Sequence, residues 1–233
     1  MKVAIMQPYF FPYIGYFQLI NAVDKFVVYD NIKFTKKGWI NRNRVLVNGK
    51  DNYLTLPLKK DSDFLNINQR FIAKSYLKDK TKIITKIKEL YRKAPQYKVV
   101  FPIIEVIMND NEENLFDFIL NSLKKICSYL EITTDIVIAS SIAIEHSLKS
   151  QDKVITICKA LDSTHYLNPI GGIELYCKDD FNKIGIKLNF IKSINIEYQQ
   201  FTSEFVPWLS IIDVMMFNSL EEIKQMLNEY EVL

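Results

Sequence analysis

The sequence predicts an α/β fold with a parallel or mixed sheet and a helical insertion. Three observations near the amino terminus lead to this class. KVAIM at 2–6 is a short apolar run, apolar residues recur at helical spacing over 13–23, and KFVVYD at 25–30 is a second β-rich run. A strand, a turn, a helix and a strand in such quick succession predict a βαβ unit with two parallel strands.

A hairpin and a block of helices are expected next. The stretch 45–58 places Asn48-Gly49 between two β-rich runs, which is a strong hairpin signal. Helical spacing begins at about residue 76 and predicts helices over 77–94, 101–108 and 111–130. We therefore expect one α/β domain over 1–233 with a helical insertion at about 76–130.

The strand and helix alternation resumes after the insertion. Strands are predicted at 135–140, 164–169 and 186–191, and helices at 151–161, 179–185, 209–217 and 219–230. Ser210 and Ser219 are expected to cap the last two helices, and Glu222 completes a capping box with Ser219.

Composition and charge exclude several classes of protein. The 233 residues are 48% hydrophobic and 24% charged, which is ordinary for a folded globular chain. A net charge of +3 is too small to predict nucleic-acid or membrane binding, and the apolar run at 209–217 is too short to cross a bilayer. The three cysteines are scattered, which argues against a disulfide framework or a metal site. We expect a cytoplasmic protein with no metal, no nucleic-acid partner and no membrane insertion.

The opening loop, MQPYFFPYIGYF at 6–17, is the first candidate site. Ligands of parallel sheets bind outside the carboxyl ends of the strands, and this loop follows a strand and precedes a helix that can receive an anion. Gln7 and Tyr9 are expected to contact a ligand because their polar groups need partners, whereas Phe10 and Phe17 fill either the core or the site. Asp30 ends the next strand and is expected in the same row.

The second candidate site is KKGWINRNR at 36–44. Only four of the 30 basic residues are arginines, yet Arg42 and Arg44 lie two positions apart here. The planar guanidinium suits bidentate binding of phosphate or carboxylate. Together with Lys37 and Trp39 these arginines predict an anion clamp with a stacking face, and a solvated basic loop is the alternative.

Four further residues stand out for their chemistry. His165, one of two histidines, is the first choice for a general base, and a structural hydrogen bond is its alternative role. Asp213 lies among apolar residues and needs a partner, for which an arginine of the clamp is a candidate. Gly171-Gly172 would let the backbone approach a ligand.

Together these stretches resemble the WbqC-like family of bacterial proteins. The resemblance lies in QPYFFPYIGYFQLI, VVYD, KKGWINRNR, LTLP and FVPWLSIIDVMMFN. The family's motif positions are occupied here by Gln7, Pro8, Tyr9, Phe11, Gly15, Asp30, Lys37, Trp39, Asn41, Arg42, Arg44, Tyr166, Ser210 and Asp213. The segment SINIEYQQ departs from the pattern, because a histidine and a proline are expected before its tyrosine.

The opening is also similar to that of nucleotidyltransferases, in which a strand, a proline-aromatic loop and a glycine precede a helix. There a histidine-containing motif binds ATP phosphates, whereas here Tyr13 and Tyr16 flank Gly15 and no histidine is present. The likeness favours a Rossmann-like or nucleotidyltransferase-like opening βαβ unit and argues against adenylyl transfer.

The resemblance to the WbqC-like family implies acyl or aminoacyl transfer to the amino group of a nucleotide-linked aminodeoxysugar, in biosynthesis of bacterial surface polysaccharides such as the O-antigen of lipopolysaccharide. In such an N-acyltransferase, acyl-CoA or an acyl carrier protein would donate the acyl group as a thioester. Asp30 or His165 would accept the amine proton. The expected substrate-binding residues are Gln7, Tyr9, Phe11, Lys37, Trp39, Asn41, Arg42, Arg44, Tyr166 and Asp213.

Two alternatives stay open. One is an ATP-dependent ligase or nucleotidyltransferase-like enzyme that activates a carboxylate. The other is a non-catalytic sugar-nucleotide-binding protein.

Overall fold

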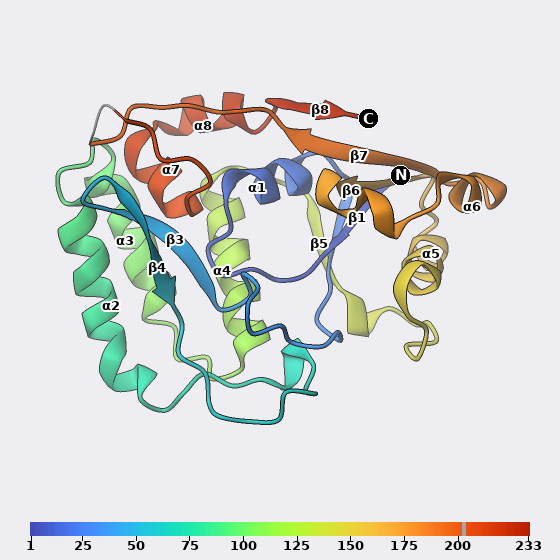
Figure 1. Cartoon of the computed structure of the whole chain (residues 1–233), viewed down its shortest axis with the longest axis horizontal. Helices are drawn as coiled ribbons and strands as arrows, with labels where there is room; N and C mark the ends of the chain where they lie inside the picture. Colours follow the sequence, from blue (N-terminus) through green and yellow to red (C-terminus); the bar gives the residue numbers. More distant parts are fainter. Residues whose placement is uncertain (202–203) are drawn as a thin grey trace.

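A computed structural model of the chain describes residues 1–201 and 204–233. Six strands form one sheet in the order β5-β2-β1-β6-β7-β8 (Figure 1). Their bounds are β1 Lys2–Met6, β2 Lys25–Val28, β5 Asp135–Ile138, β6 His165–Pro169, β7 Lys187–Ser193 and β8 Tyr230–Val232. Neighbouring strands are parallel except β7 and β8, which are antiparallel. The predicted α/β class and the parallel β1-α1-β2 unit, in which α1 spans Ile14–Asn21, are confirmed.

The order of the strands creates a topological switch point. The chain proceeds outward from β1 to β2 and β5, then returns to place β6 on the other side of β1. In doubly wound sheets, ligands bind outside the carboxyl ends of the strands where this reversal occurs. A ligand site is therefore expected at the carboxyl ends of β1 and β6.

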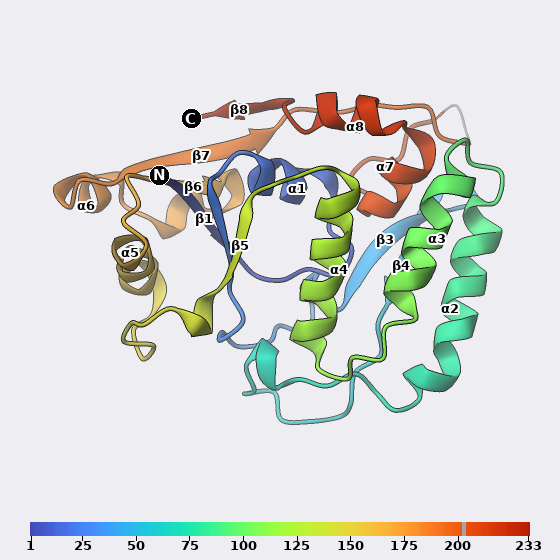
Figure 2. The ribbon, with the colours of Figure 1, turned by 180° about the vertical axis from the view of Figure 1, so that it is seen from behind.

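Helices cover both faces of the sheet. On one face the strands pack with α1, α4 (Leu115–Tyr129), α7 (Ile211–Phe217) and α8 (Leu220–Met226). On the other they pack with α5 (Ser150–Ala160) and α6 (Lys178–Lys183), which lie at one end of the molecule in Figures 1 and 2. Burial on both faces explains why the central strands are continuous apolar runs.

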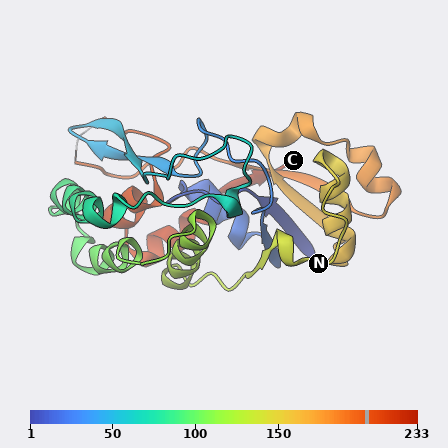
Figure 3. The same cartoon turned by 90° about the horizontal axis from the view of Figure 1, so that it is seen from below.

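The crossover from β2 to β5 carries a hairpin as well as helices. The hairpin consists of β3 (Arg42–Val47) and β4 (Lys50–Thr55), and the helices before α4 are α2 (Tyr76–Tyr91) and α3 (Tyr97–Met108). Asn48 and Gly49 have φ of +51° and +75°, as a type I′ turn requires. Figure 3 shows the hairpin beside α2 and α3 at one end of the molecule, and the Leu46 amide of β3 donates a hydrogen bond to the Tyr91 hydroxyl of α2 (3.1 Å). The hairpin begins earlier than predicted, so Arg42 and Arg44 are strand residues and not part of a loop.

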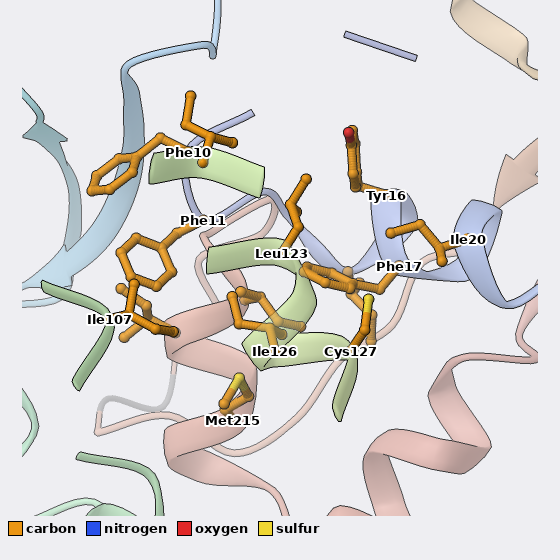
Figure 4. Packing of buried hydrophobic residues seen from close by; sticks show 14 of the residues in the cluster. Phe10, Phe11, Tyr16, Phe17, Ile20, Ile107, Leu123, Ile126, Cys127 and Met215 are labelled. Carbon is orange, nitrogen blue, oxygen red and sulfur yellow. The ribbon is translucent and has the colours of Figure 1, made fainter. Parts of the chain in front are cut away.

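The predicted helix caps are present. The Ser210 side chain accepts a hydrogen bond from the Ile212 amide, and Ser219 and Glu222 form the capping box of α8. Phe10, Phe11 and Phe17 are fully buried, and Figure 4 shows Phe17 beside Cys127 of α4. These phenylalanines therefore fill the core. Among the described residues, no helix has both the length and the hydrophobicity needed to span a bilayer.

Candidate functional site

The opening loop is fixed against β3. The Phe10 amide donates a hydrogen bond to the Trp39 carbonyl (3.1 Å), and the Asn43 side-chain amide donates to the Phe10 carbonyl (3.2 Å). The opening loop, which follows β1, thus lies beside the segment that carries Trp39 and Arg44.

The segment before α7 fixes the same loop from another side. The Ser210 hydroxyl donates to the Phe11 carbonyl (2.8 Å), and the Ile211 amide donates to the Pro12 carbonyl (2.9 Å). The Ser210 amide also donates to the carbonyl of Arg44 (2.8 Å). Three separate stretches of the sequence are therefore joined by hydrogen bonds into one unit around the end of β1.

A cavity of about 260 Å³, which we call the aromatic pocket, opens in this unit. It is lined by Tyr9, Tyr13, Trp39, Asn43, Arg44 and Trp208. The Arg44 guanidinium lies 5.6 Å from the centre of the Trp39 ring, and its Nη2 donates to the Trp208 carbonyl (3.1 Å). Tyr9, Trp39 and Arg44, all expected from the sequence as ligand contacts, share this pocket with Trp208, the second tryptophan of the chain.

A larger cavity of about 620 Å³ adjoins the pocket, and we call it the switch-point groove. It is lined by Tyr13, Gly15, Pro169, Ile170, Gly171, Ile191, Lys192, Ser193, Ile194, Asn195 and Trp208. Apart from Trp208, these residues lie at the start of α1 and at or just after the carboxyl ends of β6 and β7, which is where the strand order predicts a ligand. The pocket and the groove share Tyr13 and Trp208, whose rings meet edge to face with 5.8 Å between centroids.

Gly15 provides the space that Tyr13 occupies. A Cβ at Gly15 would lie 2.3 Å from Cε2 of Tyr13 and 2.4 Å from Oγ of Ser193. Helix propensity alone predicts that Gly15→Ala stabilises α1 by about 1 kcal/mol. We expect instead a loss of about 1–3 kcal/mol in the free energy of unfolding, because the added methyl group overpacks this contact.

Chemical denaturation of the Gly15→Ala variant checks this prediction. Gly171→Ala is the matched control, because a Cβ there meets no atom within 4 Å, and its stability should be unchanged. A stabilised Gly15→Ala variant would show that Tyr13 is not packed as described.

The ionisable groups of the two cavities are tyrosines and cations. Burial raises the pKa of Tyr9 and of Tyr13, so both hydroxyl groups remain protonated donors at neutral pH. Arg44 and Lys192 supply positive charge. Within the described part of the chain, no carboxylate or imidazole lines either cavity, and no three His, Cys, Asp or Glu side chains group as metal ligands.

Asp30 lies at the expected edge but is fully engaged. Its side chain is 1% exposed, Oδ2 accepts from the Asn68 side-chain amide (2.7 Å), and Oδ1 accepts from the Ser140 amide (2.9 Å). The carboxylate thus ties the end of β2 to two other segments. It lines neither cavity, so its geometry argues for a structural role and against that of a base.

His165 lies at the opposite edge of the sheet. It is the first residue of β6 and pairs with Lys2 and Lys187 near the amino ends of the neighbouring strands. The cavities lie at the carboxyl ends, so the structure does not bring His165 to them, and the expectation that it accepts the amine proton there does not fit.

The expected clamp is not assembled as a unit. The Nε and Nη2 atoms of Arg42 donate to the carbonyls of Gly38 (3.2 Å) and Lys37 (2.8 Å), and its guanidinium lies over the Tyr53 ring. The Asn41 side chain donates to the Leu56 carbonyl (2.9 Å). Arg42, Lys37 and Asn41 therefore organise the strand and the loop before it, and among the three cations of the clamp Arg44 alone lines the pocket or the groove.

Three other expected contacts lie away from the cavities. Phe11 and Tyr166 are fully buried, and the Tyr166 hydroxyl donates to the Asn168 side chain (3.0 Å). Gln7 contributes its carbonyl, which accepts from the Tyr16 hydroxyl (2.9 Å). These residues shape the rim and core beneath the site.

Asp213 has tyrosine and glutamine partners in place of the expected arginine. It is 0% exposed and accepts hydrogen bonds from the Tyr91 hydroxyl (2.9 Å), the Tyr198 hydroxyl (2.7 Å) and the Gln200 side chain (2.9 Å). This network joins α7 to α2 and to the segment before residue 201. The structural role weighed for Asp213 therefore fits its surroundings.

The pH dependence of stability should reveal the burial of Asp213. Burial raises its pKa above the ordinary value of 3.8, so the folded protein holds this proton more tightly than the unfolded chain. The contribution of Asp213 to stability should accordingly fall as pH rises from 3.8 through the raised pKa. We would measure the free energy of unfolding of the wild type and of Asp213→Asn across this window. The wild type should lose stability relative to Asp213→Asn as pH rises, and a relative gain would contradict a raised pKa.

Tyr13 and Trp208 line the candidate site, although the sequence did not single them out. Both line the pocket and the groove, and Trp208 is exposed beside buried Leu209 and Ser210. A signal was available, since the chain has two tryptophans and each lies in a distinctive motif.

Comparison with known proteins agrees with the motifs that form this site. Residues 7–225 match the sequence profile of the WbqC-like protein family. The chain belongs to the WbqC-like protein family. The matched region contains every residue that lines the aromatic pocket and the switch-point groove. A protein of Mycobacterium tuberculosis (strain ATCC 25618 / H37Rv), the uncharacterized protein Rv1507c, is 27% identical over 218 residues, which cover 92% of each chain. No solved structure matches this WbqC-like protein.

Proposed function

We propose that this WbqC-like protein binds a nucleotide-linked aminodeoxysugar in the pocket and groove and transfers an acyl or aminoacyl group to its amine. The observation that carries the proposal is the junction of the two cavities at Tyr13 and Trp208. The groove occupies the position at which doubly wound sheets bind nucleotides, and the pocket presents aromatic rings and Arg44. Such rings stack on a base or on the apolar face of a sugar.

The proposed reaction forms an amide from a thioester. The amine nitrogen attacks the thioester carbonyl carbon, the C–N bond forms, the C–S bond breaks, and the departing thiol takes the proton that the amine loses. An acyl-CoA or an acyl carrier protein is the proposed donor. Tyr9, Tyr13 and Arg44 provide hydrogen-bond donors that hold substrate oxygens, and positioning alone lowers the barrier substantially.

A non-catalytic sugar-nucleotide-binding protein is the second candidate. It is favoured by the lack of a carboxylate or imidazole among the described residues that line the cavities. In the proposed transfer the proton therefore passes to the thiol or to solvent, whereas a binding protein needs no proton acceptor.

Mass spectrometry of UDP- and dTDP-linked amino sugars, incubated with the protein and a panel of acyl-CoAs with and without ATP, tests the proposal. The expected result is an ATP-independent product heavier by one acyl group less one hydrogen. A product formed only with ATP, together with AMP, would identify a ligase. Binding without any product would identify a binding protein, and the absence of both would overturn the proposal.

A further inference from the structure

Trp208 adopts a backbone conformation that bulky residues avoid. Its φ is +59°, in the left-handed region, and its side chain is 53% exposed. Hydrogen bonds hold the chain on both sides of Trp208. Arg44 donates to the Trp208 carbonyl, and the Ser210 amide donates to the Arg44 carbonyl. Before Trp208, the Gln200 side chain donates to the Val206 carbonyl and accepts from the Val206 amide. Strained residues of this kind are concentrated at ligand sites.

The Trp208 side chain stands between the two cavities. It lines both the aromatic pocket and the switch-point groove, as does Tyr13. In contrast, Trp39 lines the pocket and not the groove, and Ile194 lines the groove and not the pocket. The two cavities therefore have separate walls and one shared boundary.

Size and position distinguish the two cavities. The groove of about 620 Å³ lies within the range of about 300–1,000 Å³ that is usual for small-molecule sites, whereas the pocket of about 260 Å³ falls just below it. The groove can hold a nucleoside, and the pocket can hold a single ring. The groove is also the cavity at the switch point, where nucleotides bind in sheets of this order.

We propose that Trp208 divides the site into a nucleotide subsite in the groove and a sugar subsite in the aromatic pocket. This inference rests on the proposed binding of a nucleotide-linked amino sugar. Trp208 is then a positioning residue whose strained backbone holds the indole against both parts of the ligand.

Calorimetry with three variants and two ligands tests the division. The ligands are free UDP or dTDP and the corresponding nucleotide-linked amino sugar. Trp39→Ala should weaken binding of the nucleotide sugar by about tenfold and leave binding of the free nucleotide within about twofold. Trp208→Ala and Ile194→Ala should weaken both ligands, and Trp208→Phe should restore most of the affinity lost in Trp208→Ala.

Each opposite result has a distinct meaning. Equal weakening of both ligands by Trp39→Ala, or unchanged affinity in Trp208→Ala, would overturn the division while leaving the proposed function intact. A wild-type protein that binds neither ligand would overturn both.

Thermal unfolding tests the strain separately. Trp208→Gly and Trp208→Ala both remove the indole, but only glycine relieves the left-handed backbone. The glycine variant should melt about 2–4 °C above the alanine variant, and the two should bind equally weakly. A glycine variant that melts below the alanine variant would contradict the strained conformation.

Discussion

Arg44→Ala should weaken binding of a nucleotide-linked amino sugar by about 30-fold, which corresponds to about 2 kcal/mol. Arg44 is the one cation among the described residues that line the aromatic pocket. Its guanidinium lies over the Trp39 ring, Nη1 forms an ion pair with Asp51 (3.1 Å), and Nη2 donates to the carbonyl of Trp208. The substitution therefore removes both a positive charge from the pocket lining and the hydrogen bond to Trp208, which lines both cavities. Isothermal titration calorimetry measures the loss.

Arg42→Ala is the matched control for Arg44→Ala. Arg42 lies two residues earlier on β3 but lines neither cavity, and its guanidinium donates to the carbonyls of Lys37 and Gly38. Its loss should lower stability by about 1 kcal/mol and leave affinity within about threefold. Equal loss of affinity in the two variants would show that both arginines bind the ligand, as the sequence predicted, and would contradict the assignment of ligand binding to Arg44 alone.

Asp213→Ala should lower the free energy of unfolding by about 3 kcal/mol or more. The alanine leaves three buried donors, on Tyr91, Tyr198 and Gln200, without their acceptor. The network holds α7 and the segment that leads to Trp208, so the cavities should lose their shape as well. Urea denaturation at neutral pH measures the change in stability.

Tyr198→Phe is the control for Asp213→Ala, because it removes one donor and leaves the carboxylate with the other two. It should cost about 1 kcal/mol. A loss below about 1 kcal/mol in Asp213→Ala itself would show that the carboxylate does not organise this part of the fold.

Local sequence patterns predicted most of the fold. The β1-α1-β2 unit and the Asn48-Gly49 hairpin depend on short-range periodicity and turn chemistry, and both are present. The strand β8 was missed because its three residues carry no periodic signal and it forms by pairing with the distant β7. The early start of β3 was missed because polar residues there concealed a strand.

The site was predicted in part. Ligands are expected outside the carboxyl ends of parallel strands, and arginine is rare in this chain. These two observations predicted Tyr9, Trp39 and Arg44 as ligand contacts, and the three residues share one pocket. His165 begins β6, so it lies at the amino ends of the strands, whereas ligands are expected at the carboxyl ends. No local pattern could separate Arg42 from Arg44, because their different roles depend on contacts with other segments.

Tryptophan fluorescence tests most directly whether the aromatic pocket is the ligand site. Both tryptophans line this pocket, so Trp39→Phe and Trp208→Phe each leave one reporter within it. Titration with a UDP- or dTDP-linked amino sugar should change the emission of both single-tryptophan proteins, with a Kd that agrees with calorimetry on the same variant. Calorimetric binding with no change in either emission would place the ligand elsewhere and contradict the account.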